Sequence, residues 1–271
     1  GTQMGLTSFA FHPEFATNGR FYTVVSVSIL SGTPDFLAKR PIDGGGRNKN
    51  PFFHDVILEW TADDPSAATF TGTYREILRM EQPYDDHNLG EVAFNPTAEP
   101  GDPDYGLLYA AVADGGNVFP AEDPDPEDNG QDRTTVLGSV IRIDPMGTNS
   151  ANGQYGIPTD NPFTALDDLT LHEIWTYGHR NHHRMSWDLE TGTHYSFEMG
   201  QAMVDEINIL RPGRNYGWGE REGSFMIYES DLDTLLPLPE DEGEEVFTYP
   251  VFQYDHPFGT DEGSAIAGGF V

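Results

Sequence analysis

Cysteine is absent from the 271-residue chain, and only two of its 14 basic residues are lysines, Lys39 and Lys49. Without thiols the chain has no disulfides, no thiolate zinc site, no iron–sulfur cluster and no cysteine nucleophile. Any redox chemistry in this chain therefore requires a bound cofactor.

Basic residues are also scarce beside the 45 acidic ones, and the formal net charge is −31. Such a surface repels nucleic acid and anionic membranes, because both associations depend on Lys and Arg meeting phosphate. It suits high salt, which screens self-repulsion, or a calcium-rich exterior, where carboxylates find cations. We expect a halophilic or marine origin, with calcium loading as the alternative.

Long apolar runs are missing as well. None approaches the roughly 18 residues of a membrane span, so no membrane insertion is expected. No signal peptide is visible at the start. Because the chain opens with Gly1-Thr2-Gln3 rather than Met, that absence says little about export.

Short strands dominate the predicted secondary structure. Runs of β-branched and aromatic residues bounded by turn residues predict strands, and a strand, turn and strand spans Met185 to Phe197 with Gly192 at the turn. No stretch of 12 or more residues has a strong helical period, so helix is expected at most as a turn within Phe163 to Leu171. The spacing is compatible with four-stranded propeller blades. The other predicted strands are Phe21–Ile29, Asp55–Trp60, Leu107–Val112 and Ser139–Ile143.

An acidic loop spans residues 121–132 and invites a calcium interpretation. It lacks the ligand order and the glycine of an EF-hand, and Pro124 and Pro126 stiffen it differently. A solvated loop is therefore favoured over a metal site. Its acidic residues are Asp123, Asp125, Glu127, Asp128 and Asp132.

His87 follows a pair of carboxylates, Asp85 and Asp86. An adjacent carboxylate can orient an imidazole and raise its basicity, which a general base needs near neutral pH. The alternative is a turn histidine satisfied by hydrogen bonds.

Asp205 and Glu206 lie in a strand-like context. Carboxylates buried in a strand are costly unless they are paired or bind a cation. A hard cation is therefore more plausible here than in the acidic loops.

The stretch Tyr177–Arg184, YGHRNHHR, concentrates histidine and arginine in this acidic chain. Histidines two residues apart in a strand lie on the same face. A zinc site needs at least a third ligand, which here would have to come from another part of the fold, because the local sequence has no HExxH-like pattern. Arg180 and Asn181 offer a charged fork and an amide, which suit carboxylate or quinone oxygens better than a metal. We interpret the histidines as polar loop residues; they are His179, His182 and His183.

Several ordered motifs extend over nearly the whole chain, and together they resemble the glucose/sorbosone dehydrogenase family, the soluble quinoprotein sugar dehydrogenases that use pyrroloquinoline quinone (PQQ). The resemblance implies an all-β fold, a six-bladed β-propeller of which residues 1–271 form a part of roughly four blades, lacking the family's N-terminal blade and its C-terminal blade or blades. The matching segments are Gly5–Tyr22, Asp86–Phe94, Val136–Pro145, Tyr155–Phe163, Tyr177–Asn181, Asp205–Asn208, Asn215–Trp218 and Ala265–Gly269.

The resemblance also implies an activity, the oxidation of the anomeric hydroxyl of an aldose to the lactone with hydride transfer to PQQ. His87 falls at the position of the general base, and Asp86 beside it as the orienting partner. Arg180 and Asn181 fall where residues contact the cofactor. The implied partners are a sugar substrate and an external electron acceptor, and the implied location is periplasmic or extracellular.

Calcium is the second cofactor that the resemblance implies. The carbonyls of Gly200 and Gln201 fall where the family holds the calcium of the cofactor. Glu206 and the carbonyl of Tyr216 fall at a second, structural calcium site.

The chain departs from the family pattern at several positions. Leu89 replaces a glycine and could crowd the cofactor, and Gln201 replaces a proline whose carbonyl alone is needed. His182 and His183 replace a proline and a glutamine. The alternative function is a non-catalytic, calcium-stabilised propeller that serves binding or assembly in an extracellular protein.

Overall fold

Nearly all of the regular structure is β. The computed structural model describes residues 5–38, 53–84, 86–116, 125, 127–166, 168–201, 203–228, 234–240, 242, 246–255, 265–266 and 268–269. Within these ranges the helical elements are α1 (Phe15–Asn18) and a 3-10 turn (Ile29–Ser31), and none is long and apolar enough to cross a membrane. Where residues 163–171 are described, they form turns and bends rather than a helix. The prediction of an all-β fold is confirmed.

The first sheet is an antiparallel meander of four strands in chain order, and two of the predicted strands lie in it. Gly19 has φ 67° where α1 ends, and a side chain there would meet the carbonyl of Ala62 at 2.6 Å, so this turn requires glycine. The strands are β1 (Leu6–Phe11), β2 (Arg20–Ser28), β3 (Phe53–Ala62) and β4 (Gly72–Glu81).

The second sheet is also a four-stranded meander. Its two central strands are buried along their whole length, which explains their almost continuous apolar sequence. The strands are β5 (Leu89–Phe94), β6 (Leu108–Val112), β7 (Ser139–Ile143) and β8 (Ile174–Tyr177).

The third sheet contains the predicted hairpin, whose turn residue Gly192 has φ 70° as expected. Its strand order is β15-β11-β10-β9, and a small sheet of order β12-β13-β14 follows β11 in the chain. The strands are β9 (His182–Trp187), β10 (His194–Glu198), β11 (Val204–Ile209), β12 (Arg221–Glu222), β13 (Phe225–Ile227), β14 (Leu235–Leu236) and β15 (Phe252–Asp255).

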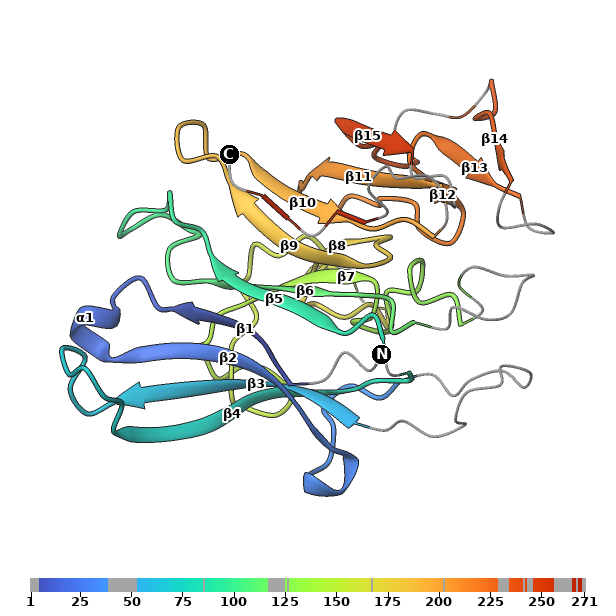
Figure 1. Cartoon of the computed structure of the whole chain (residues 1–271). Helices are drawn as coiled ribbons and strands as arrows, with labels where there is room; N and C mark the ends of the chain where they lie inside the picture. Colours follow the sequence, from blue (N-terminus) through green and yellow to red (C-terminus); the bar gives the residue numbers. More distant parts are fainter. Residues whose placement is uncertain are drawn as a thin grey trace.

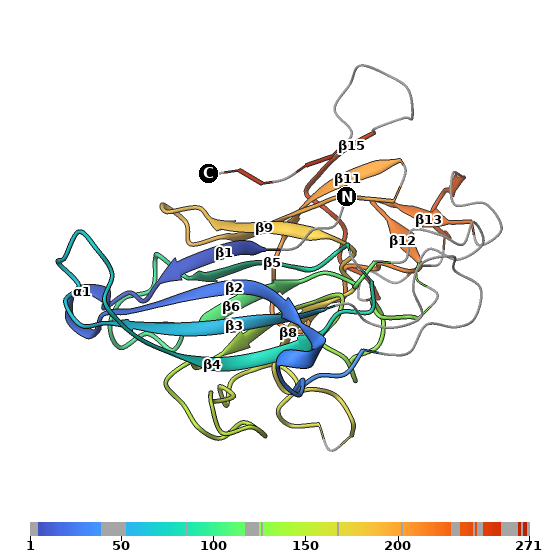
Figure 2. The same cartoon turned by 60° about the horizontal axis from the view of Figure 1, so that its bottom comes forward.

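The three four-stranded sheets succeed one another in chain order, and their first strands are neighbours, β1 beside β5 and β5 beside β9 (Figures 1 and 2). Apolar side chains such as Tyr22, Ile57 and Leu108 fill the core that joins the first two sheets. Tyr109 and Met185 belong to the cluster that joins the second sheet to the third. Successive meanders whose first strands lie next to one another in this way are arranged as the blades of a propeller.

Candidate active site

The predicted catalytic and cofactor residues converge because of how the second sheet is wound. In a meander the start of β5, the end of β6, the start of β7 and the end of β8 lie at the same end of the sheet. His87 precedes β5, Asp114 follows β6 and Arg180 follows β8. The backbone bonds that join these connections run from Asp114 N to Arg180 O (2.8 Å) and from Gly115 N to His87 O (3.2 Å).

His87 is buried, and its Nδ1 lies 2.7 Å from Oδ1 of Asp114. A carboxylate can only accept, so Nδ1 carries the hydrogen and the neutral ring has its lone pair on Nε2. Nε2 has no hydrogen bond to any residue in the described ranges. Asp114, and not the adjacent Asp86, is thus the carboxylate that contacts the His87 ring, while the catalytic roles expected for His87 and Asp86 stay predictions.

Asp86 lies on the other side of this turn, against Gly116. A side chain added to Gly116, whose φ is 84°, would approach Oδ1 of Asp86 to 2.0 Å. The Gly116 amide also donates to Oδ1 of Asp114 (3.0 Å). Gly116 therefore allows the two connections to pack closely, while His87 itself has a positive φ of 52°.

Arg180 is 5% exposed, and its guanidinium donates to Gln201 Oε1 at 2.7 and 3.2 Å and to the Met199 carbonyl at 3.1 Å. It also lies over the ring of Trp218, with Cζ 5.2 Å from the centroid. No carboxylate of the described chain forms an ion pair with this guanidinium. The hydrogen bonds of this buried guanidinium all go to neutral groups, so Arg180 is suited to an anionic ligand.

Asn181 is also buried, and its carbonyl accepts a hydrogen bond from the amide of Met199 at 3.3 Å. This bond ties the connection after β8 to the connection after β10. The structure thus places Asn181 beside Arg180, and its contact with a cofactor stays a prediction.

Gly200 and Gln201 lie between β10 and β11. The Gly200 amide donates to Oδ1 of Asp205 at 3.0 Å, and a side chain at Gly200 would collide with the carbonyl of Val204. The side chain of Gln201 holds Arg180, a contact that the sequence did not indicate. Calcium binding by the two carbonyls stays a prediction.

Glu206 is buried next to a second carboxylate, Glu198. It accepts from the amide of Gly223 (2.5 Å) and from Nδ2 of Asn208 (2.9 Å). Burial raises the pKa of both Glu198 and Glu206 to about 8. The charge of Glu198 contributes to the rise at Glu206. A buried carboxyl group of this kind is costly unless it is paired or binds a cation, and the cation expected at Glu206 stays a prediction.

Tyr216 is buried, and its hydroxyl donates to the carbonyl of Ile209 at 2.6 Å and accepts from the amide of Arg211 at 2.9 Å. Its ring is stacked on His179, with centroids 4.6 Å apart. The proposed calcium contact of its carbonyl is not tested by these interactions.

Of the histidines interpreted as polar loop residues, His179 does lie in a connection, between β8 and β9, whereas His182 and His183 lie in β9, so the interpretation was wrong for those two. His179 and His182 are fully buried, and His182 begins β9. Burial lowers the pKa of His179 to about 3 and that of His182 well below its usual value, so both rings are neutral at pH 7. His183 is partly buried.

The acidic loop is also less solvated than expected, as far as it is described. Asp125 and Glu127 are buried. Asp125 accepts from the amides of Asn129 and Gly130, and Glu127 accepts from the hydroxyl of Tyr84 at 2.9 Å. The expectation of a solvated loop was therefore wrong for these two residues, while Asp123 lies outside the described residues.

Leu89, which replaces a family glycine, is fully buried in the core of the first two sheets. Its amide donates to Oδ2 of Asp55 at 3.0 Å. The extra side chain is thus accommodated by the core.

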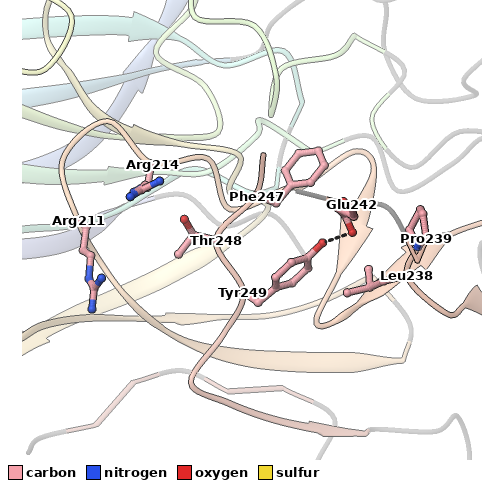
Figure 3. A pocket seen from close by; sticks show the side chains of 8 residues that line it. All are labelled: Arg211, Arg214, Leu238, Pro239, Glu242, Phe247, Thr248 and Tyr249. Carbon is pink, nitrogen blue, oxygen red and sulfur yellow. Dashed lines mark hydrogen bonds between the residues drawn. The ribbon is translucent and has the colours of Figure 1, made fainter. Parts of the chain in front are cut away.

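A cavity of about 350 Å³ contains none of the predicted site residues (Figure 3). The hydroxyl of Tyr249 donates to Glu242 at its wall (2.6 Å). The residues that line this cavity are Arg211, Arg214, Leu238, Pro239, Glu242, Phe247, Thr248 and Tyr249.

Consecutive four-stranded meanders, whose connections at one end carry a His–Asp pair and a buried arginine, define part of a β-propeller. The chain belongs to the glucose/sorbosone dehydrogenase family, whose model matches residues 1–260. The predicted family is confirmed.

Among curated relatives, the HIPL2 protein of Arabidopsis thaliana is 29% identical over 299 residues, covering 99% of this chain and 40% of the relative. Quinoprotein glucose dehydrogenase B of Acinetobacter calcoaceticus is 27% identical, covering 83% of this chain and 43% of the relative. This chain therefore spans less than half the length of these relatives.

A solved structure, the PQQ-bound aldose sugar dehydrogenase of Streptomyces coelicolor, is similar with a TM-score of 0.58 at 22% identity, covering 94% of this chain and 55% of that one. This likeness confirms the predicted fold class, part of a β-propeller.

Proposed function

We propose that this chain forms the catalytic part of a PQQ-dependent aldose dehydrogenase that oxidises the anomeric hydroxyl to the lactone. The observation that supports it most is the pairing of His87 with Asp114 beside a buried Arg180 that has no carboxylate partner among the described residues. A base and an anion-binding cation at one end of a propeller are what such a reaction needs from the protein.

The residues present fit both proposed cofactors. Arg180 and Asn181 would hold the anionic quinone, while the carbonyls of Gly200 and Gln201 would hold its calcium. Glu206 and the Tyr216 carbonyl would hold a second calcium, for which the buried carboxylate is the most direct support. When bound, PQQ supplies the electron acceptor and calcium polarises it.

His87 performs the proton step in this proposal. Its Nε2 lone pair accepts the proton of the anomeric hydroxyl as the carbon–hydrogen bond breaks. Asp114 fixes the ring and stabilises the imidazolium that forms, as the carboxylate of a catalytic triad does. The bonds of Asp114 to Gly116 and Trp218 keep that carboxylate in place.

We further propose that residues 1–271 are part of a single propeller whose other blades complete the cofactor site, and that the protein works outside the cytoplasm with an external electron acceptor. The acidic surface supports a salt-rich setting, because screening lowers the repulsion of a net charge of −31.

The alternative is a calcium-stabilised binding or assembly propeller without turnover. The similarity to a HIPL protein, whose name states no enzymatic activity, keeps this second function in view. Retention of His87, Arg180 and Asn181 in one site favours the enzyme.

The deciding experiment adds PQQ and calcium to the full-length protein and follows dye reduction with a panel of aldoses. We expect sugar-dependent reduction and a quinone absorbance that survives dialysis. If dye reduction and retained absorbance are both absent, the protein is not a quinoprotein dehydrogenase and the binding function stands.

A further inference from the structure

Three side chains that can bind metal meet beneath Arg180. His179, His182 and Glu198 are buried, and each offers one ligand atom within 4.8 Å of the others. His182 at the start of β9 is the cross-strand partner of Glu198 at the end of β10, and the register shifts at this point. His179 comes from the connection after β8, so folding supplies a third ligand that sequence spacing alone could not.

His182 has an unusual environment for a polar side chain. It is 0% exposed, and neither ring nitrogen has a hydrogen-bond partner among the described residues. The backbone of Ser139 approaches the ring without reaching good hydrogen-bond geometry. Buried polar atoms without partners are rare and costly, so a group that uses a nitrogen of His182 is the expected reason for its position.

His179 is already oriented for coordination. Its Nδ1 lies 3.0 Å from Oε2 of Glu198 and its Nε2 lies 2.9 Å from the hydroxyl of Thr176. With Nδ1 on a metal, Nε2 would donate to Thr176, which is the usual outer contact of a metal-bound histidine. Stacking on Tyr216 fixes the plane of the ring.

Glu198 presents Oε2 to the same position, where this oxygen also accepts a long hydrogen bond from Nδ2 of Asn208 at 3.4 Å. Oε1 accepts from the backbone amide of Arg180, which leaves Oε2 facing His179. Glu198 also interacts electrostatically with the carboxyl groups of Asp114 and Glu206 and with the guanidinium of Arg180. A divalent cation at Oε2 would stabilise the ionised form of this buried carboxyl group.

We propose that His179, His182 and Glu198 bind a divalent metal ion of the zinc class, separately from the calcium sites. Ligands at about 2.0–2.2 Å from a tetrahedral ion lie roughly 3.4 Å apart. The three ligand atoms lie within 4.8 Å of one another, so binding requires the side chains to adjust their positions. Two imidazoles and one carboxylate suit zinc or cobalt, whereas calcium prefers a full set of oxygens. The ion would brace the connections after β8 and β10, which carry Arg180 and Gln201.

The test uses the full chain without PQQ, stripped with EDTA and dialysed. Cobalt is added, and the visible spectrum is recorded; zinc is then added, and bound metal per chain is measured by mass spectrometry. We expect an intense d–d absorption of tetrahedral cobalt, its loss on zinc addition, one zinc per chain, and no displacement by excess calcium. Absence of the cobalt band, or its displacement by calcium, would overturn the proposal.

Variants locate the ion. His182→Ala should weaken zinc binding at least a hundredfold and abolish the cobalt band. His194→Ala is the matched control, because His194 is a buried histidine of the same sheet whose Nε2 lacks a partner but which lies outside the cluster. If His182→Ala does not fold, Glu198→Gln keeps an acceptor for the Arg180 amide and should also remove the band. Full zinc affinity in the folded ligand variant would assign the metal elsewhere.

Because these measurements need neither sugar nor quinone, a negative result would leave the proposed dehydrogenase function untouched.

Discussion

The indole of Trp218 donates a hydrogen bond to Asp114, 104 residues earlier in the chain, with Nε1 2.8 Å from Oδ2. The other carboxylate oxygen of Asp114 accepts from His87 and from the Gly116 amide. Both oxygens are thus engaged, and the carboxylate cannot rotate away from His87. The same indole lies under Arg180, so one side chain supports both halves of the site.

Replacing Trp218 with phenylalanine should separate these two roles. Trp218→Phe keeps an aromatic ring under Arg180 but removes the donor to Asp114, so we expect kcat to fall about tenfold with little change in PQQ affinity. Steady-state kinetics and quinone titration measure the two effects. Trp175→Phe is the control, since Trp175 packs in another cluster. A large loss of PQQ affinity with kcat intact would contradict the assignment.

His87→Asn tests the proposed base. Asparagine tolerates the positive φ of 52° at this position but cannot act as a base near pH 7, so the backbone should be preserved. We expect kcat to fall by about 10²–10⁴ while the increase in Tm caused by calcium is unchanged. Loss of that increase along with activity would show that His87 is structural. His172→Asn, at a histidine outside the site, should change neither quantity.

Arg180→Lys tests the anion site while keeping the charge. Lysine cannot reproduce the forked contact with Gln201 or the stacking on Trp218, so we expect the Kd for PQQ to rise about 10- to 100-fold. Fluorescence quenching or calorimetry measures it. Arg214→Lys, at an exposed arginine, should leave the Kd unchanged. An unaltered Kd in Arg180→Lys would place the quinone elsewhere.

Asp55 provides a test of stability against pH. Burial raises the pKa of Asp55 to about 6, although Leu89, Ser26 and Gln82 donate to it. The folded state therefore holds this proton more tightly than the unfolded state, whose pKa is 3.8, and stability is lost as pH rises from about 4 through 6.

The loss amounts to roughly 3 kcal/mol in the free energy of unfolding, because each unit of pKa is worth about 1.4 kcal/mol. Asp55→Asn cannot ionise, so the difference in unfolding free energy between wild type and variant should change between pH 4 and pH 7 by about this amount, in favour of the variant. Denaturant titrations at both values measure it. A difference that stays constant with pH would show that Asp55 does not titrate in this range.

Local pattern was enough for the strands that were predicted, and it singled out His87 and Arg180, whose roles stay predictions. The β-branched runs and the turn at Gly192 are properties of a few neighbouring residues, and the structure contains the corresponding strands. Local pattern does not identify the side chains that these histidines contact, because the partners are distant in the sequence. Asp114 is 27 residues from His87, and Glu198 is 19 residues from His179. Only the winding of the sheets brings such pairs together.

Burial was also hard to predict for polar residues. The segment from His179 to Arg184 consists of polar and charged residues, and this composition is typical of a loop. Its packing partners come from other elements, as Tyr216 does for His179. Asp125 and Glu127 lie in an acidic, proline-rich stretch, yet backbone amides and Tyr84 satisfy them inside the fold. The composition of a segment predicts only its average exposure to solvent. The burial of these polar residues instead depends on individual contacts with residues that are distant in the sequence.

The positions of His87, Asp114 and Arg180 on connections, rather than inside the strands, have a consequence for engineering. The hydrogen-bond ladder from β5 to β8 includes none of the three residues, so their loops could be transplanted or diversified while the ladder is conserved. For the proposed dehydrogenase, a library confined to the loop positions beside these three residues would therefore sample new substrate preferences on an unaltered scaffold.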